Sequence, residues 1–277
     1  MFEVDQAAGL RRLFDRKQLR VIVLGGAGAA KASVVVNLAV ALTEQGRRVM
    51  LMDGSAGEVV SALGLTCRYE LSHVIAGDKR LTEVLLTGPK RIQVLPATRG
   101  LDQLDMLAAD EARRLRHEFF HLQHPIDTLI VNARPLGSGR ALDAFQGRAK
   151  VLMVACGGAA SITAAYGEMK ALKLANSMTE FDIVIGGIED AQDATSVYTN
   201  IAEVAHRFLD AKLNLRGFIP EDATFRTAHK VKQPVSLLNA GSASAGAFHR
   251  IASEMNQWLT QKGTVMPTKE INYATAC

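Results

Sequence analysis

The residues that could do chemistry gather in one short segment, GGAGAAKASVVVNLA, which spans residues 25–39. It follows an apolar, β-branched run and opens a helical pattern. Glycines at this position let backbone N–H groups wrap phosphates, and Lys31 would face the β- and γ-phosphates of a nucleotide. The segment alone is equally compatible with a Gly/Ala-rich turn between a strand and a helix, so the rest of the chain must decide.

Short apolar runs alternate with helical patterns from residue 20 onward, and these elements must position the segment. The strand candidates are continuous apolar runs, as expected for strands buried on both faces. They lie at 20–24, 48–52, 91–95, 127–131, 150–154, 181–185 and 215–219. Helices are expected at 33–45, 109–122, 160–175, 193–210 and 242–259, with a short amphipathic one at 5–17. This alternation predicts an α/β fold with a doubly wound, mostly parallel sheet and an N-terminal amphipathic helix.

Composition and charge narrow the classes of function. Of the 277 residues, 48% are hydrophobic and 22% charged, which is typical of a globular protein. The net charge of +4 is modest and does not predict nucleic-acid binding. Three cysteines without C-x-x-C spacing favour a reducing cytoplasm. We expect a partner-binding segment at 1–19, one α/β domain at 20–260 and a flexible tail at 261–277.

The sequence continues as NLAVALTEQGRRVMLMD, and the whole stretch resembles the MinD/ParA group of deviant Walker ATPases. That group has the signature K-G-G-x-G-K-[ST], then N-L-A, then G-x-x-V-x-x-x-D. Segments 69–100 and 215–235 are similar to the corresponding parts of the FlhG family of flagellar-number regulators. The opening DQAAGLRRL resembles that family's D-Q-A-x-x-L-R motif. The resemblance implies a P-loop NTPase-like fold for this chain.

The resemblance also exposes departures from a working ATPase. The signature lysine, which in the family reaches the partner subunit's phosphates, falls on Gly26. The magnesium-binding hydroxyl falls on Ala32, the water-positioning aspartate on Ser55 and the Walker B aspartate on Asn132. The asparagine that reads adenine falls near Gly186. The residues that keep the pattern of a degenerate nucleotide or anion site are Gly25, Gly28, Lys31, Ser33 and Asp53.

Phosphoryl transfer depends on positioning and on charge neutralisation by lysine and magnesium. The replacement of four functional residues of one site, at Gly26, Ala32, Ser55 and Asn132, therefore predicts a pseudo-ATPase. Such a protein has no catalytic residue, no metal site and no cofactor. If the nucleotide site is still used, ATP with Mg²⁺ is the expected ligand. The alternative is a slow, atypical ATP-binding switch of the MinD type that relies on Lys31 and Ser33.

The resemblance at the N-terminus implies a partner. In the FlhG family the D-Q-A motif stimulates the GTPase of FlhF, a relative of the signal-recognition GTPases. The corresponding residues here are Asp5, Gln6, Ala7, Leu10 and Arg11. The expected function is regulation of flagellar placement or number, and flagellar C-ring or transcription-regulator proteins are further expected partners. A homodimer, a mixed dimer and packing of segment 5–17 on its own domain all stay open. We expect a cytoplasmic protein, with weak membrane contact at most, that a partner recruits to the cell pole or inner membrane.

A competing motif lies at residues 117–121, where HEFFH matches the H-E-x-x-H signature of zinc peptidases. That chemistry needs two histidines of one helical face on zinc and the glutamate as general base. His124 lies nearby as a further ligand candidate. The segment belongs to a helix that leads into a strand, whereas ligand sites of open α/β sheets lie beyond the carboxyl ends of the strands. We interpret the motif as a polar helix face.

Overall fold

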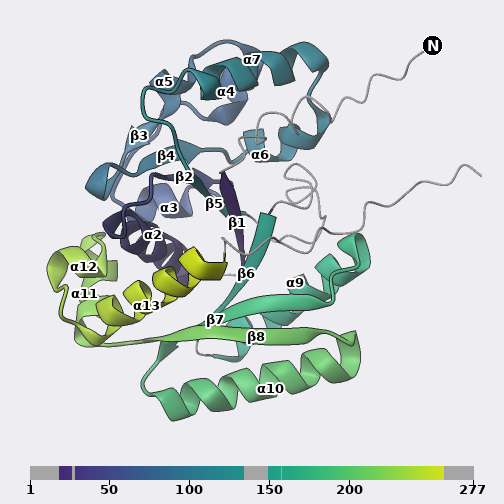
Figure 1. Cartoon of the computed structure of the whole chain (residues 1–277), viewed down its shortest axis with the longest axis vertical. Helices are drawn as coiled ribbons and strands as arrows, with labels where there is room; N and C mark the ends of the chain where they lie inside the picture. Colours follow the sequence, from purple (N-terminus) through teal and green to yellow (C-terminus); the bar gives the residue numbers. More distant parts are fainter. Residues whose placement is uncertain (1–18, 27–28, 134–148, 157, 259–277) are drawn as a thin grey trace, which may run out of the picture.

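A computed structural model of the chain describes residues 19–26, 29–133, 149–156 and 158–258 (Figure 1). Its described strands form one sheet in the order β3-β4-β2-β5-β1-β6-β7-β8. Every strand pair is parallel except β3 with β4. The strands are β1 (Arg20–Gly25), β2 (Val49–Asp53), β3 (Leu86–Thr87), β4 (Gln93–Pro96), β5 (Thr128–Asn132), β6 (Ala149–Cys156), β7 (Glu180–Ile188) and β8 (Lys212–Pro220).

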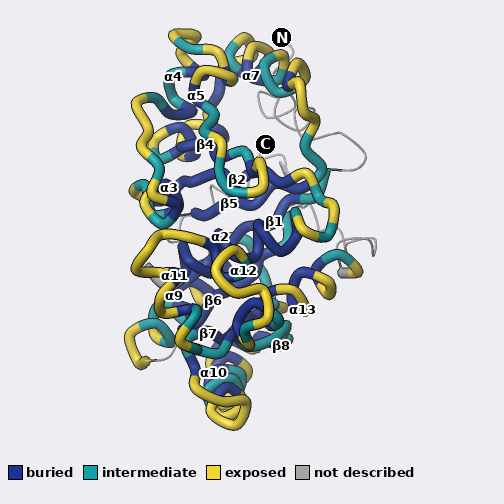
Figure 2. Tube along the Cα trace, turned by 90° about the vertical axis from the view of Figure 1, so that its left-hand side faces the viewer, coloured by how far each residue is buried: buried dark blue, intermediate teal, exposed yellow. Residues whose placement is uncertain are grey.

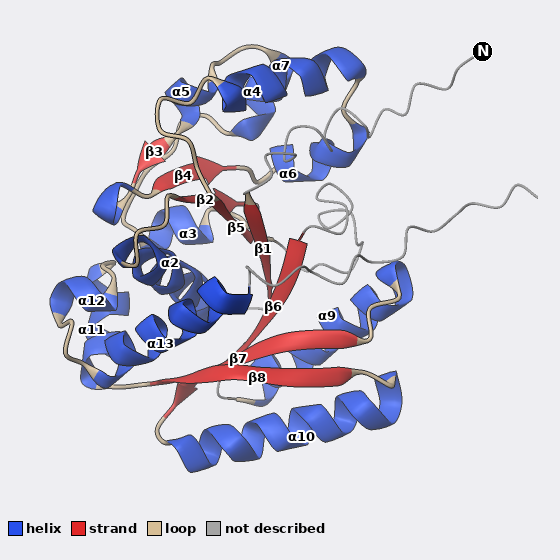
Figure 3. Ribbon diagram, in the orientation of Figure 1, coloured by secondary structure: helices blue, strands red, loops and turns tan. Residues whose placement is uncertain are grey.

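Helices connect these strands and flank the sheet (Figure 3). In both views α10 lies beside β8, while α4, α5 and α7 lie toward the β3–β4 end. The described helices are α2 (Ala29–Glu44), α3 (Glu58–Ala62), α4 (Leu71–Ala76), α5 (Leu81–Val84), α6 (Gly100–Gln103), α7 (Ala109–Phe120), α9 (Ala159–Asn176), α10 (Ala191–Leu209), α11 (Ala223–Val231), α12 (Val235–Leu238) and α13 (Ala243–Trp258). Two 3₁₀ turns, η1 (Pro89–Arg91) and η2 (Leu104–Met106), complete the described elements.

Side chains of the central strand β1 contribute to two separate hydrophobic cores, because successive side chains of a strand point to opposite faces of the sheet. Val21 and Val23 belong to the core that includes residues of α4, α7, α9 and α10. Ile22 and Leu24 belong to the core that includes residues of α2 and α13. Figure 2 shows the buried residues running along the central strands between these helices. The predicted doubly wound, mostly parallel sheet is therefore confirmed.

Two predicted boundaries need correction. The strand expected at 91–95 begins only at Gln93, because Pro89–Arg91 form η1 and both Lys90 (φ 53°) and Arg91 (φ 64°) have left-handed backbone conformations. The helix expected from residue 33 begins earlier, at Ala29. The predicted helix at 5–17 and the whole predicted tail at 261–277 lie outside the described residues, so the three-part division stays a prediction. Among the described helices, none is both long and apolar enough to span a bilayer.

Candidate functional site

The sheet brings the candidate residues together at the carboxyl ends of its central strands. Strand β5 pairs with β1 on one side and with β2 on the other, so Asn132 is in register with both Leu24 and Asp53. The loop after β1 starts at the same edge, directly before α2. This edge is where open α/β sheets bind ligands. The register thus places Asp53 and Asn132 next to each other at the edge where the loop after β1 begins.

Lys31 lies in the first turn of α2 and is buried, with 2% of its surface exposed. Its Nζ donates a hydrogen bond of 2.7 Å to the main-chain carbonyl of Ala133, the residue after β5. Burial lowers the pKa of Lys31, and attraction to Glu168 is the largest effect that opposes this. The one family lysine that the sequence keeps is therefore engaged with the protein's own backbone.

Asp53 forms the centre of a buried cluster of polar groups at the end of β2. Its Oδ1 accepts hydrogen bonds from Ser55 Oγ at 2.6 Å and from Asn132 Nδ2 at 3.3 Å. Its Oδ2 accepts the backbone N–H groups of Val59 and Val60 at 2.9 and 3.1 Å. Asn132 Nδ2 also donates to Ser55 Oγ at 2.8 Å. We call Asp53, Ser55, Asn132 and these two amides the Asp53 cluster.

The Asp53 cluster is closed to solvent and uses all of its central carboxylate. A carboxylate offers about four lone-pair sites, and the four donors named above occupy them. Asn132 Oδ1 is the exception in the cluster, since it is buried without a hydrogen-bond partner among the described residues. Asp53 therefore serves as a cap for α3 and as an acceptor for the two residues that stand where the family has acids.

Gly26, at the position of the signature lysine, has no room for a side chain. Its φ is +109°, and a Cβ built on it would lie 2.2 Å from the carbonyl oxygen of Val154 in β6. Its N–H donates to Glu168 Oε2 of α9, with an N···O distance of 2.7 Å. In this backbone conformation the position excludes any residue with a Cβ, lysine included.

Glu168 is the site residue that the sequence analysis missed. It is 5% exposed, and burial raises its pKa to about 7, partly opposed by the Gly26 N–H and by Lys31. Its second oxygen, Oε1, has no hydrogen-bond partner among the described residues. The sequence feature that could have identified Glu168 is its position in α9, on the same buried stripe as Ala165, Met169 and Leu172. A carboxylate in an apolar helix stripe is rare and makes this position a candidate for a functional site.

The remaining candidate on α2, Ser33, lies two residues after Lys31. Ser33 is buried, and its carbonyl accepts a hydrogen bond from Asn37 Nδ2 at 2.8 Å. Asn37 Oδ1 in turn accepts the N–H of Val235 at 2.7 Å, which ties α2 to α12. Gly25, expected to begin the loop, is instead the last residue of β1, and Gly28 lies outside the described residues.

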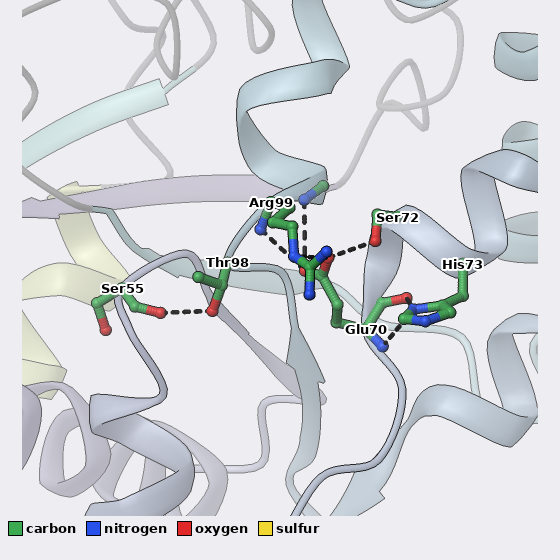
Figure 4. A network of polar contacts seen from close by, with 7 residues as sticks. Ser55, Glu70, Ser72, His73, Thr98 and Arg99 are labelled. Carbon is green, nitrogen blue, oxygen red and sulfur yellow. Dashed lines mark hydrogen bonds and ion pairs between the residues drawn. The ribbon is translucent and has the colours of Figure 1, made fainter.

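A second polar network fixes the loop after β2 to the loop after β4 (Figure 4). Thr98 Oγ1 donates to the carbonyl of Ser55 at 2.8 Å. Glu70 Oε2, just before α4, accepts the N–H groups of Arg99 at 3.0 Å and of Gly100 at 3.3 Å. Glu70 also accepts from Ser72 Oγ. The Thr98 bond holds the backbone of Ser55, a member of the Asp53 cluster, and the Glu70 bonds hold the residues that follow Thr98.

Of the H-E-x-x-H residues, His117 and Glu118 lie on α7 and His121 is its C-cap, away from this edge of the sheet. Glu118 Oε2 accepts the N–H of Leu81 at 2.7 Å, so the glutamate caps α5. The His117 and His121 rings stack with centroids 4.0 Å apart, and His121 Nδ1 lies 2.8 Å from the carbonyl of His117. Within the described ranges, no group of three or more His, Cys, Asp or Glu side chains could hold a metal ion.

The donor set around the loop does not fit a magnesium–nucleotide complex. Ala32 has no hydroxyl, Asn132 offers a neutral amide, and the oxygens of Asp53 already accept four donors. Mg²⁺ sites in proteins use one or two available carboxylates together with substrate phosphates. The site keeps the position of a nucleotide site without the ligands that would complete it.

Comparison with known proteins assigns the chain to a family. It is 33% identical over 244 residues to the antiactivator FleN of Pseudomonas aeruginosa, a match that covers 87% of each chain. It is 23% identical over 240 residues to an uncharacterised ATP-binding protein of Methanocaldococcus jannaschii, covering 84% of this chain and 86% of the relative. No family model matches.

Solved structures agree on the fold. The MinD cell division protein of Aquifex aeolicus superposes with a TM-score of 0.62 at 18% identity, covering 86% of this chain and 97% of MinD. A ParA family ATPase of Chlorobium tepidum gives a TM-score of 0.62 at 14% identity, covering 86% and 99%. At such low identities these structures show the fold alone. The chain belongs to the FleN/FlhG family of flagellar regulators, built on the MinD/ParA fold.

Proposed function

We propose that this protein is a flagellar regulator of the FleN/FlhG type that acts by binding partners and does not hydrolyse ATP. The observation that carries the proposal is the closed Asp53 cluster. Its three side chains stand where the family would place a carboxylate, a water-positioning acid and a metal-supporting acid, and they bond to one another instead.

Two further contacts support the loss of hydrolysis. Lys31 donates to the Ala133 carbonyl, and Gly26 cannot hold the cross-dimer lysine in this conformation. Phosphoryl transfer relies almost wholly on charge neutralisation and positioning. Because each of these groups is missing or engaged elsewhere, the site lacks a route by which to stabilise the transferred phosphoryl group.

Binding is the remaining mode of action. The relative that is 33% identical is named an antiactivator, a protein that works by restraining another. The D-Q-A segment, similar to the motif that stimulates FlhF in the FlhG family, lies outside the described residues. We propose that Asp5 and Gln6 contact an FlhF-like GTPase of the signal-recognition type, with the α/β domain as their scaffold.

The hydrolysis part is tested by phosphate release from ATP with Mg²⁺, comparing the natural protein with Lys31→Ala. We expect both to match the rate of a protein-free blank. Turnover by the natural protein that disappears in Lys31→Ala would favour the slow, atypical ATPase and overturn the proposal.

The partner part is tested with an FlhF-like GTPase from the same organism. The natural protein should accelerate GTP hydrolysis, and an Asp5→Ala/Gln6→Ala double variant should lose this effect. Glu3→Ala, outside the D-Q-A motif, is the matched control and should behave as the natural protein does. Equal stimulation by the double variant would remove the motif from the mechanism.

A further inference from the structure

We propose that Glu168 is an internal anion of the loop after β1: its carboxylate takes the place of bound phosphate beside Lys31 and keeps anions out. The inference rests on the proposed function, because it explains why Lys31 and the Gly26 N–H are engaged without a nucleotide. It concerns a residue of α9, outside the sequence segments that identify the family's nucleotide site.

The first argument is the hydrogen bond itself. Glu168 Oε2 accepts the N–H of Gly26 at 2.7 Å, across 142 positions of the chain. Loops of this type bind phosphate by directing backbone N–H groups at its oxygens. A carboxylate oxygen that accepts such a group is a chemical equivalent of a phosphate oxygen, supplied here by the protein.

The second argument is the balance of buried charge. Lys31 is 2% exposed and Glu168 is 5% exposed, and each shifts the pKa of the other toward the charged form. A buried cation without a counter-charge is strongly unfavourable. Glu168 is the largest contributor to that counter-charge, ahead of Glu58 and Asp53. A phosphate that approached Lys31 would therefore meet a buried negative charge beside the cation.

The third argument is the spare oxygen. Glu168 Oε1 is buried with no hydrogen-bond partner among the described residues. Neighbouring positions of the same helix stripe hold Ala165, Met169 and Leu172. An apolar side chain at this position would avoid burying an unsatisfied oxygen, which is costly. Packing alone therefore does not account for a carboxylate here; acceptance of the Gly26 N–H and the negative charge beside Lys31 do.

The experiment is an equilibrium titration at pH 8 with pyrophosphate and with ADP, both without magnesium. At this pH the carboxyl, whose pKa is about 7, is mostly charged. Glu168→Gln keeps an oxygen acceptor for the Gly26 N–H and removes only the charge. Natural protein should give no measurable binding at millimolar ligand. Glu168→Gln should bind pyrophosphate with a dissociation constant at least about tenfold below that millimolar limit, a gain of about 1.4 kcal/mol.

Two controls give the result its meaning. Adding Lys31→Ala to Glu168→Gln should abolish the gained binding, because the lysine provides the attraction. Glu70→Gln is the matched control: Glu70 is also buried and also accepts backbone N–H groups, but from Arg99 and Gly100 at another place. It should gain no binding. Glu168→Leu fits the apolar stripe and should also gain binding, which keeps the test open if Glu168→Gln does not fold.

The outcomes separate this inference from the proposed function. If folded Glu168→Gln and Glu168→Leu proteins bind no pyrophosphate, Glu168 is not an anion substitute, while an ATPase-inactive natural protein leaves the proposed function standing. If the natural protein binds pyrophosphate as tightly as Glu168→Gln, the inference is also wrong. Release of phosphate from ATP by the natural protein contradicts the proposed function instead.

Discussion

The amide of Asn132, at the end of β5, donates to the carboxylate of Asp53, at the end of the neighbouring strand β2, across 3.3 Å. The two residues are directly in register in the sheet. The resemblance to the MinD/ParA group implies an aspartate at position 132; here an amide stands there and donates to Asp53. Asn132 and Asp53 thus belong to one buried hydrogen-bonded unit together with Ser55.

Restoring the acid at position 132 should therefore destabilise the protein. Asn132→Asp removes two hydrogen bonds donated by Nδ2 and places a second carboxylate beside buried Asp53. We expect a loss of about 3 kcal/mol in the free energy of unfolding at pH 8, by the rules for unpaired buried charges. Urea denaturation measures it, and the loss should shrink near pH 5 as one carboxyl gains a proton. An unchanged midpoint at pH 8 would show that the cluster is not closed.

Gly26→Lys should fail to rebuild the signature lysine. Its φ of +109° and the 2.2 Å approach of a Cβ to Val154 O force a backbone shift. We expect a loss of about 2–3 kcal/mol in stability, typical of strain at such positions, and no gain in ATP turnover. Gly167→Ala in α9 is the matched control, since a Cβ there meets nothing within 4 Å. It should stabilise the helix by about 0.5–1 kcal/mol.

Thermal denaturation of both variants and of the natural protein measures these differences in stability. A Gly26→Lys protein as stable as the natural one would contradict the geometry at Gly26.

Glu168 should make stability depend on pH. Burial raises its pKa from 4.5 to about 7, so the folded state binds this proton more tightly than the unfolded state. Its contribution to the free energy of unfolding therefore falls as pH rises from about 4.5 to about 7, and the cost is complete above that range. At about 1.4 kcal/mol for each pKa unit, the total is about 3 kcal/mol.

The comparison with Glu168→Gln isolates this contribution, because other titrating groups affect both proteins alike. We expect the stability difference between the variant and the natural protein to grow in favour of the variant between pH 5 and pH 8. Urea denaturation at several pH values measures it. A difference that stays constant over this range would mean that Glu168 does not titrate there.

The sequence was sufficient for the large elements and for the position of the site. Long apolar strands and three-turn helices appear as continuous patterns, so the predicted strand at 127–131 and β5 (Thr128–Asn132) differ by one residue. Short elements escaped because they depend on tertiary contacts. The four residues of α6 begin where Glu70 accepts the N–H groups of Arg99 and Gly100, and no local pattern announces that contact.

The replaced residues of the site were visible as departures from a family pattern, but their new bonds were not. That Asn132 donates to Asp53, or that Lys31 donates to the Ala133 carbonyl, follows only from the packing of β1, β2 and β5. Glu168 lies 142 positions from its partner Gly26. No spacing rule connects residues so far apart. A glutamate at a buried position of an apolar helix stripe is nevertheless visible in the sequence as an exception to the pattern.

The central claim is that this fold works without using ATP, and titration calorimetry tests it most directly. Chelator-washed protein is titrated with ATP and with ADP, each with and without Mg²⁺. The closed Asp53 cluster and the Glu168–Gly26 contact predict no heat of binding at millimolar nucleotide. Magnesium-dependent binding of ATP in the micromolar range would contradict this account, because it would require ligands that the described site does not provide.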